Sequence, residues 1–230
     1  MLFRSTLAYN AVHSPMQATD RHLEAFSHLP DIHRRIFAAM LAHLDESVGA
    51  VLAQLHSNGL EENTLVVFLS DNGGPTRELT SSNAPLRGEK GQLYEGGIRV
   101  PMAIAWKGKI PARQTFAQPV MSFDLNVTAL AAAELAPAAN ADGASLLPLL
   151  RGESTAAPHA ALHWRVGPRH ALRAGDWKII RNGDGPWELY NLAADIAEAT
   201  DLATPHPERV QALAALWNEW NSQQLAPRWR

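Results

Sequence analysis

The chain has 230 residues, with no cysteine, a net charge of −3 and a hydrophobic content of 46%. Such a chain can form one large domain, or a core with a small appendage. The lack of cysteine excludes disulfides and thiolate metal sites, and the charge gives no reason to expect a nucleic-acid partner. No apolar run approaches the roughly 20 residues of a membrane span, so we expect none.

Three elements are predicted in the first third of the chain. Loose alternation over Leu2–Tyr9 indicates a short strand. Apolar residues then recur at helical spacing between Asp31 and Asn58, where Asn58-Gly59 is typical of a helix end. The β-branched run Thr64–Ser70 follows and predicts a strand buried on both faces.

The segment after this strand is rich in polar residues and glycine. Asp71 and Asn72 come directly after the strand, before Gly73-Gly74. A carboxylate and an amide oxygen at the carboxyl end of a strand make a half-site for a hard cation. Four glycines then lie within Leu86–Pro101, and Lys90 stands between two glycine-flanked turns. We expect this backbone to pass close to another group.

The next predicted elements are a strand over Ile98–Trp106 and a helix from Asp124 to about Leu135. Asp124 is interpreted as the N-cap of that helix rather than as a metal ligand. A short helix is predicted within Gly143–Gly152, before a linker at Ser154–Pro158.

The last third of the chain predicts an antiparallel meander closed by a helix. Strand-like runs cover Ala161–Val166, His170–Asn182 and Trp187–Leu192, and the second is broken by a turn at Gly175-Asp176. Apolar residues at helical spacing predict an amphipathic helix over Glu208–Gln223.

Several of these segments together resemble the type I sulfatases, the arylsulfatase-like enzymes of the alkaline phosphatase superfamily. The resemblance is carried by Ser70-Asp-Asn-Gly-Gly, then Leu86-Arg-Gly-Glu-Lys-Gly, then Glu95-Gly-Gly-Ile-Arg-Val-Pro. Tyr9–Gln17 is similar to the family segment with an Asn-x-x-His-x-Pro core. Leu172–Arg181 is similar to a segment of the family's C-terminal subdomain.

The resemblance implies an α/β fold. Residues 1–155 would form the C-terminal part of an alkaline-phosphatase-like core with a mostly parallel sheet, and residues 156–230 a small antiparallel subdomain with a closing helix. In the family, a long N-terminal half precedes the segment that resembles Tyr9–Gln17. We therefore expect that this chain corresponds to a piece of a longer sulfatase.

The resemblance also implies the roles of four residues. Asp71 and Asn72 match metal ligands, with Ca²⁺ the usual ion and Mg²⁺ the less favoured one. Lys90 matches the lysine that contacts the sulfate, and His13 matches a sulfate-side histidine that could donate a proton or contact the anion. Each assignment also has a simpler interpretation. Asp71 and Asn72 could form a strand-end turn without metal, Lys90 could be a solvated loop lysine, and His13 could be a buried histidine.

Three further residues of the same segments are interpreted as structural. Arg87, Glu95 and Arg99 are expected to tie the glycine-rich loop together rather than to touch substrate.

Several parts of a sulfatase site have no counterpart in this sequence. Family members carry Cys-x-Pro-x-Arg or Ser-x-Pro-x-Arg, whose first residue is oxidised to formylglycine, the nucleophile as a hydrated aldehyde. The paired aspartates that complete the metal site are also missing, as is the Gly-Lys-x-His segment. Two protein ligands would leave a cation that needs 6–8 oxygens mostly hydrated.

The expected function is therefore hydrolysis of a sulfate monoester of a small molecule or glycan, by a chain that is inactive alone and needs a missing N-terminal half. Two alternatives stay open: a non-catalytic fragment or module, and a phosphatase or phosphonate hydrolase of the same superfamily. The compartment cannot be predicted from this sequence, although the family is often periplasmic, secreted or lysosomal.

Overall fold

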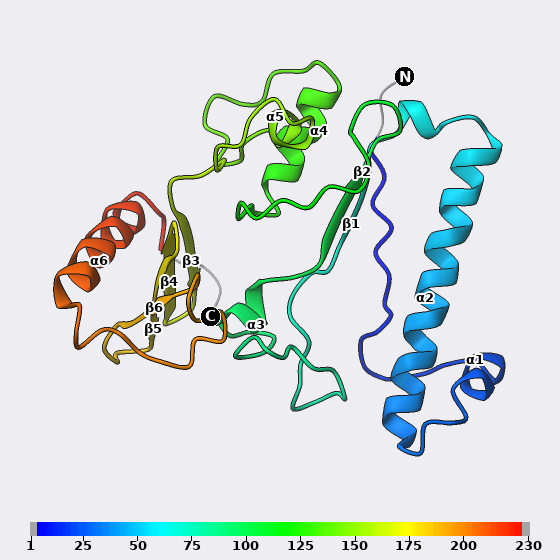
Figure 1. The fold of residues 1–230 in the computed structure, drawn as a ribbon, viewed down its shortest axis with the longest axis horizontal. Helices are drawn as coiled ribbons and strands as arrows, with labels where there is room; N and C mark the ends of the chain where they lie inside the picture. The colour runs from blue at the N-terminus through cyan, green and yellow to red at the C-terminus, as the bar shows by residue number, and fades with distance from the viewer. Residues whose placement is uncertain (1–3, 227–230) are drawn as a thin grey trace.

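The computed structural model describes residues 4–226, which form an α/β arrangement with two small sheets (Figure 1). The four-stranded sheet and α6 lie at one end, and the long helix α2 lies at the other. The two-stranded sheet β1–β2 and the short helices α3, α4 and α5 lie between them. The α/β class expected from the sequence is thus observed.

Helix α2 spans Ile32–Ser57 and agrees with the helix predicted from the apolar spacing. Asp31 caps its start, because a side-chain oxygen accepts a 2.6 Å hydrogen bond from Arg34 N. Asn58 forms its C-cap. The shorter helix α1, Asp20–Ala25, packs beside it and was not predicted.

Helix α2 is also long and apolar enough to cross a membrane, with a mean hydropathy of 1.5 over an 18-residue window. The sequence interpretation missed this because polar residues interrupt the apolar ones. A single helix of this kind is weak evidence for a membrane span, since core helices of soluble proteins have similar composition.

Strands β1, Val66–Leu69, and β2, Met102–Ala105, pair antiparallel, with Val66 opposite Ala105. Strand β1 follows the 3₁₀ turn Glu61–Asn63, and strand β2 follows the segment 95–101. Both sheets within residues 4–226 are antiparallel, so the mostly parallel sheet that was predicted is not seen there. The expected burial of β1 on both faces is wrong, because Val67 and Phe68 are exposed.

The first predicted strand, Leu2–Tyr9, is also not observed in its described part. Residues 4–10 are extended but unpaired, and residues 1–3 lie outside the described part of the chain. This segment runs between β1 and α2 in Figure 1. Without a hydrogen-bonded neighbour, an alternating segment does not become a strand.

Helix α3, Glu95–Ile98, was not predicted, and its last residue falls at the start of the strand expected over Ile98–Trp106. Helices α4, Asp124–Ala132, and α5, Leu147–Leu150, match predicted helices but are shorter. Asp124 is the first helical residue rather than the N-cap, which is Phe123. The Asp124 carboxylate is fully buried and accepts hydrogen bonds of 2.8 Å from Met121 N and Ala144 N.

The C-terminal part agrees closely with the predicted meander and helix. Strands β3, Leu162–Val166, β4, Arg169–Ala174, β5, Trp177–Asn182, and β6, Glu188–Asn191, form one antiparallel sheet in that order. Helix α6, Pro207–Ser222, covers one face of this sheet.

Two hydrophobic clusters lie on either side of this sheet. One joins Leu172 and Ile179 to Leu213 and Trp217 of α6. The other joins strand residues such as Ile180 to Leu93 and Tyr94, which precede α3. The second cluster therefore crosses the predicted domain boundary at residues 155 and 156, and the division into 1–155 and 156–230 stays a prediction.

Candidate active site

The turn after β1 is packed directly against the backbone of α3. Gly73 N donates a 3.0 Å hydrogen bond to Gly97 O. A Cβ atom at Gly73 would lie 1.7 Å from Gly96 O, and one at Gly97 would lie 2.2 Å from Gln92 O. Two backbones can approach this closely only without side chains, which explains the glycines and confirms the close approach expected from the sequence.

The loop that carries Lys90 is held against the same two segments. Gly96 N donates a 2.7 Å hydrogen bond to Arg87 O. Asn83 bridges the loop to the turn after β1, because its side chain accepts from Gly74 N at 2.9 Å and donates to Gly74 O and Gly88 O. Asn83 had no predicted role. Its only signal in the sequence is its place in a polar stretch between the two glycine-rich motifs.

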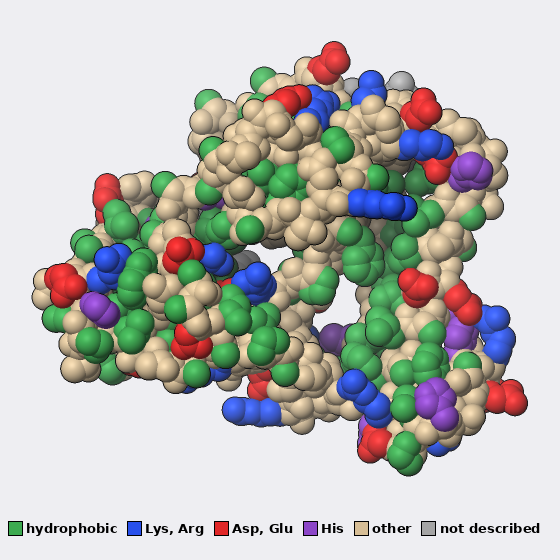
Figure 2. Space-filling view, in the orientation of Figure 1, with side chains coloured by type: hydrophobic (Ala, Val, Ile, Leu, Met, Phe, Trp, Pro, Cys, Tyr) green, Lys and Arg blue, Asp and Glu red, His purple; other side chains and the backbone are tan. Residues whose placement is uncertain are grey.

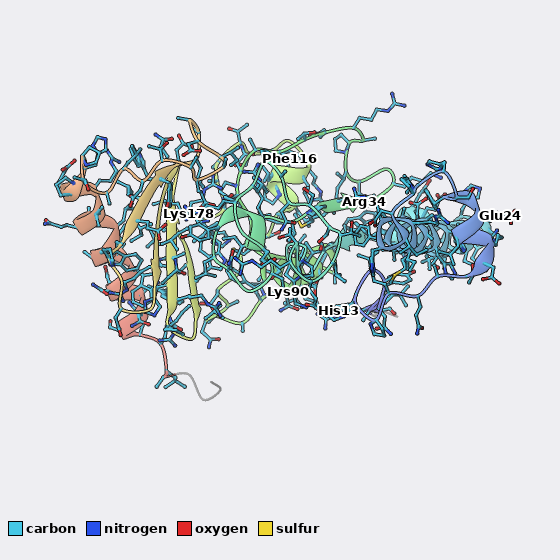
Figure 3. All side chains as sticks on the ribbon, turned by 90° about the horizontal axis from the view of Figure 1, so that it is seen from below. His13, Glu24, Arg34, Lys90, Phe116 and Lys178 are labelled. Atoms are coloured by element: carbon cyan, nitrogen blue, oxygen red, sulfur yellow. The ribbon has the colours of Figure 1, made fainter. Side chains whose placement is uncertain are left out.

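Lys90 and His13 meet although 77 residues separate them in sequence. Lys90 Nζ lies 3.1 Å from His13 Nε2, and both side chains are exposed (Figure 3). His13 Nδ1 lies 2.7 Å from the carbonyl oxygen of Ser14. Because a carbonyl oxygen only accepts, Nδ1 carries the proton in this contact, and Nε2 is left to accept from the Lys90 ammonium. Two cation-capable side chains thus face solvent together, which is an arrangement suited to an anion.

Asp71 and Asn72 lie at the tip of the turn after β1. Asp71 Oδ1 accepts a 2.9 Å hydrogen bond from Asn72 N, and Asn72 Nδ2 donates to Gly73 O at 3.0 Å. The Asn72 amide oxygen and the second Asp71 oxygen are then available as oxygen donors. Within residues 4–226, no group of three or more His, Cys, Asp or Glu residues could hold a metal ion. The two residues therefore suit a hard cation chemically but do not form a complete site.

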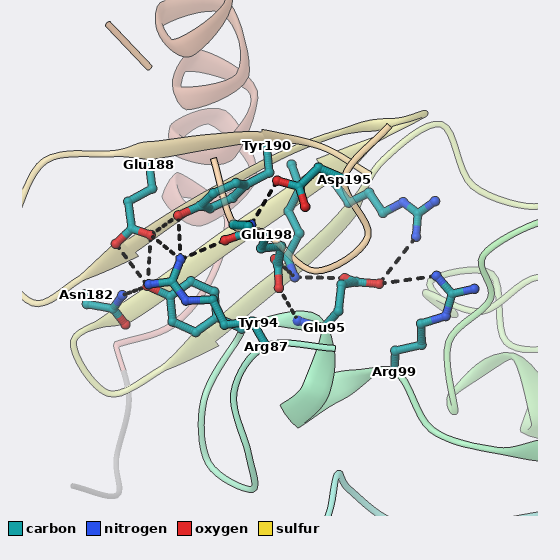
Figure 4. A network of polar contacts seen from close by, with 12 residues as sticks. Arg87, Tyr94, Glu95, Arg99, Asn182, Glu188, Tyr190, Asp195 and Glu198 are labelled. Atoms are coloured by element: carbon teal, nitrogen blue, oxygen red, sulfur yellow. Dashed lines mark hydrogen bonds and ion pairs between the residues drawn. The ribbon is translucent and has the colours of Figure 1, made fainter. Parts of the chain in front are cut away.

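A buried ion cluster fixes the start of α3. Lys178 Nζ of β5 lies 2.8 Å from Glu95 Oε1 and 2.8 Å from Glu198 Oε1, and these three side chains are at most 3% exposed. Glu198 Oε2 also accepts a 2.6 Å hydrogen bond from Glu95 N (Figure 4). Burial raises the pKa of the Glu198 carboxyl, and the nearby Lys178 ammonium opposes this rise.

Neither Lys178 nor Glu198 was singled out from the sequence. The sequence did offer one signal for Lys178, because this lysine stands between the apolar residues Trp177 and Ile179 in a predicted strand. Glu95 was expected to tie the loop, and its pairs with Lys178 and with Arg99, 3.6 Å away, agree with that interpretation.

Arg87 ties the loop to the C-terminal sheet through a second set of contacts. Its Nη1 donates to Tyr190 Oη at 2.8 Å and to Glu198 O at 2.9 Å. Its guanidinium stacks over the Tyr94 ring at 4.0 Å, and Tyr94 Oη donates to the Glu188 carboxylate. Burial, followed by the hydrogen bond and charge of Glu188, raises the pKa of Tyr94 to about 12.

The sequence is similar to known sulfatases over most of its length. The sulfatase family model matches residues 3–135, and the C-terminal model of N-sulphoglucosamine sulphohydrolase matches residues 88–224. The uncharacterized sulfatase YdeN of Escherichia coli is 33% identical over 172 residues, covering 73% of this chain and 30% of YdeN.

Solved structures give the same result for the fold. Ps i-CgsB, solved in complex with k-i-k-neocarrahexaose, superposes with a TM-score of 0.88 at 32% identity, over 97% of this chain and 51% of that one. A phosphonate monoester hydrolase of Agrobacterium radiobacter has a TM-score of 0.66 at 22% identity, over 84% of this chain and 42% of that one. The second likeness concerns the fold alone.

The chain therefore spans 30% of the length of YdeN and 51% of the length of Ps i-CgsB. The sulfatase model nevertheless covers more than half of this chain, including the four predicted site residues. On this match and on the fold, the chain belongs to the type I sulfatases of the alkaline phosphatase superfamily.

Proposed function

We propose that this chain supplies Lys90, His13, Asp71 and Asn72 to a sulfatase site that hydrolyses sulfate monoesters to an alcohol and sulfate. The observation that carries the proposal is the 3.1 Å contact between Lys90 Nζ and His13 Nε2. Lys90 sits on a loop joined through Asn83 and Gly96 to the turn that bears Asp71 and Asn72, and His13 reaches Lys90 from the N-terminal segment. One anion site and one cation half-site thus belong to a single packed unit.

Each residue has a chemical part in this proposal. The compact ammonium of Lys90 would bind the sulfate oxygens as a point charge. His13 would contact the anion or, after Nε2 has gained a proton, give it to the leaving alcohol oxygen, which needs one when the sulfur–oxygen bond breaks. Asp71 and Asn72 would hold Ca²⁺, or less favourably Mg²⁺, with two of its oxygen ligands. A cation there would draw charge from the sulfate oxygens.

The nucleophile and the remaining metal ligands must come from outside these residues. The chain has no cysteine and no serine in the family's formylglycine context. We propose that the equivalent of a sulfatase N-terminal half completes the site. An open apolar cavity of about 600 Å³ supports this, since Leu41, Val48 and Phe68 line it and Leu41 and Phe68 are exposed.

The same apolar face is visible on the surface. Figure 2 shows hydrophobic side chains gathered between β1 and α2, where a soluble protein usually presents polar ones. A covering segment would bury this face and bring the missing ligands to the turn after β1.

The proposed substrate is a sulfate ester of a glycan or of a small molecule. The relative Ps i-CgsB was solved with a neocarrahexaose, which supports a glycan. The net charge of −3 does not favour a nucleic-acid partner.

Complementation tests this proposal. The chain would be co-expressed with the N-terminal half of a related sulfatase carrying matured formylglycine, and the complex assayed on an aryl sulfate with Ca²⁺. Lys90→Ala should lower turnover by about 10²–10³, the size seen when one preorganised charge donor is lost. Asp71→Ala should remove most of the activity, because the cation then lacks a carboxylate.

The matched control is Lys109→Ala, which removes an exposed lysine elsewhere on the surface and should leave turnover unchanged. If the complex forms and both Lys90→Ala and Asp71→Ala turn over like the parent, the assignment is wrong. An aryl phosphonate and an aryl phosphate serve as comparison substrates. Faster turnover of either would favour the alternative hydrolase class. The chain alone should turn over none of the three, because it lacks a nucleophile.

A further inference from the structure

We infer that Lys178 is a positioning residue for the proposed anion site, although it lies in the C-terminal sheet and outside the loop that carries Lys90. This inference rests on the proposed function, because it concerns the same site. Lys178 belongs to β5 and is fully buried, while Lys90 is exposed at the loop surface (Figure 3). Two steps of direct contact join them.

The first step runs from Lys178 to the backbone of α3. Its ammonium lies 2.8 Å from a carboxylate oxygen of Glu95 and 2.8 Å from one of Glu198. The second Glu198 oxygen accepts from Glu95 N at 2.6 Å. Glu95 is therefore held by its side chain and by its backbone amide, and both contacts lie within one buried cluster (Figure 4).

The charges of this cluster depend on Lys178. Two buried carboxylates face one fully buried ammonium, and the guanidinium groups of Arg99 and Arg173 lie 3.6 and 3.9 Å from Glu95 Oε2. Removing the ammonium would leave two like charges close together in a region shielded from water. The start of α3 would then move to separate or rehydrate them.

The second step runs from α3 to both halves of the proposed site. Gly96 N is bonded to Arg87 O in the Lys90 loop, and Gly97 O is bonded to Gly73 N next to Asn72. A Cβ at Gly96 would lie 2.5 Å from Gly88 O, so these backbones are in contact without intervening side chains. Contacts this tight transmit a displacement of α3 to the loop and to the turn.

A positioning role of Lys178 can be distinguished experimentally from a contribution to the stability of the whole fold. Lys178 also lies in the middle of a four-stranded sheet, where its backbone pairs with Arg173 and Tyr190. If its ammonium only stabilised the fold, its loss would affect the whole sheet together with the loop. A positioning role predicts a local effect at the amides of Gly73 and Gly96 and on anion binding.

The experiment uses the full chain with two measurements. Hydrogen exchange follows the amides of Gly73 and Gly96 and, as an internal reference, those of β4 and β5. An NMR titration with inorganic sulfate follows the signals of Lys90 and His13. The variants are Lys178→Met, which keeps the length of the side chain, Lys178→Arg, which keeps its charge, and Lys109→Met, the matched loss of an exposed lysine.

In Lys178→Met we expect exchange at Gly73 and Gly96 to accelerate by about tenfold or more, with the β4 and β5 amides near their parent rates. Sulfate affinity should fall by about tenfold, and Lys178→Arg should recover part of it. Lys109→Met should change neither quantity. Should Lys178→Met fail to fold, Lys178→Gln, which removes the charge but keeps a hydrogen-bond donor, should give the same local effects.

Parent-like exchange and sulfate affinity in a folded Lys178→Met or Lys178→Gln variant would overturn the inference. Equal acceleration at all amides would also overturn it, since that is a loss of general stability. Lys90→Ala separates the two proposals. If it loses sulfate binding while Lys178→Met keeps it, the anion site stands and the positioning role falls. If Lys90→Ala binds sulfate like the parent, the proposed anion site itself is wrong.

Discussion

The apolar residues at the two ends of this molecule differ in how far they are buried. In the C-terminal sheet, Leu172 and Ile179 are fully buried under α6, and Trp217 is 2% exposed. At the other end, Leu41 of α2 is 51% exposed and Phe68 of β1 is 44% exposed. Both ends have apolar residues at regular spacing, but only the C-terminal one has the element that covers them.

The difference shows that an apolar pattern in the sequence indicates which surface must be buried. It does not indicate which element buries that surface. Helix α6 follows its sheet within the chain and packs on it. Helix α2 buries only Ala39 and Met40 among its own residues. A large exposed apolar face on an otherwise packed chain is typical of a surface that another polypeptide segment covers.

The largest contrast is expected between two aromatic substitutions. Trp217→Ala should lower the free energy of unfolding by about 3–5 kcal/mol, because it opens a cavity between α6 and the sheet. Phe68→Ala should lower it by less than about 1 kcal/mol, because that ring is already half in water. Urea unfolding of both variants measures the difference. Equal losses would mean that β1 is covered in solution and that the contrast is wrong.

Hydrogen exchange tests the same contrast without substitutions. The amides of β4 and β5 should exchange at least about 10²-fold more slowly than those of β1, because they lie in central strands over a buried core. The reverse order would indicate that β1 has gained a cover, for example from a second copy of the chain. The mass of the protein in solution, measured on the same sample, would then identify a dimer.

A smaller effect is expected from Tyr94, which joins the Lys90 loop to the C-terminal sheet. Its pKa is raised to about 12 in the folded protein from an ordinary value of 10.0. Between these values the folded state keeps a proton that the unfolded state has lost, so stability should fall as the pH rises through this range. Thermal unfolding between pH 9 and 12 measures this fall.

In Tyr94→Phe the fall should be shallower, because one of the groups that causes it is gone. Tyr9→Phe is the matched control, since Tyr9 is 41% exposed, and it should follow the parent curve. Parallel curves for the parent and for Tyr94→Phe would show that the loop does not depend on this hydroxyl.

The smallest expected effect on stability comes from polar substitution of the exposed face. Leu41→Gln should change the free energy of unfolding by less than about 0.5 kcal/mol and should reduce the binding of a hydrophobic dye. Leu216→Gln on α6 is the control, since Leu216 is 44% exposed but lies outside the cavity that Leu41 lines. If dye binding falls equally in both variants, the face between β1 and α2 is not a distinct patch.

Local sequence signals predicted the elements that depend on near neighbours. Asp31 and Asn58 mark the ends of α2 because capping uses side chains and backbone groups within one turn. Gly175-Asp176 marks the hairpin between β4 and β5 because a tight turn needs φ > 0, and Gly175 has φ 57°. The motifs with Asp71, Asn72 and Lys90 were also recognisable, since each is contiguous in the sequence.

Tertiary structure decided the features that depend on distant partners. The burial of Asp124 was not predicted because its partners Ala144 and His159 come 20 and 35 residues later in the chain. The antiparallel pairing of β1 with β2 was missed for the same reason. Helix α3 contains Gly96 and Gly97, which disfavour a helix, and it forms where backbone packing leaves no room for side chains.

The sequence by itself determined the family, the positions of α2, α4, α5, α6 and the meander, and the residue types available for an anion and a cation. Only the tertiary structure placed Lys90 beside His13 and set Lys178 under Glu95, because contacts across 77 and 83 residues leave no periodic or local trace in the chain. It also decided that the apolar stripe of α6 is covered and that of α2 is open. Burial depends on which elements meet, and a one-dimensional pattern does not contain that information.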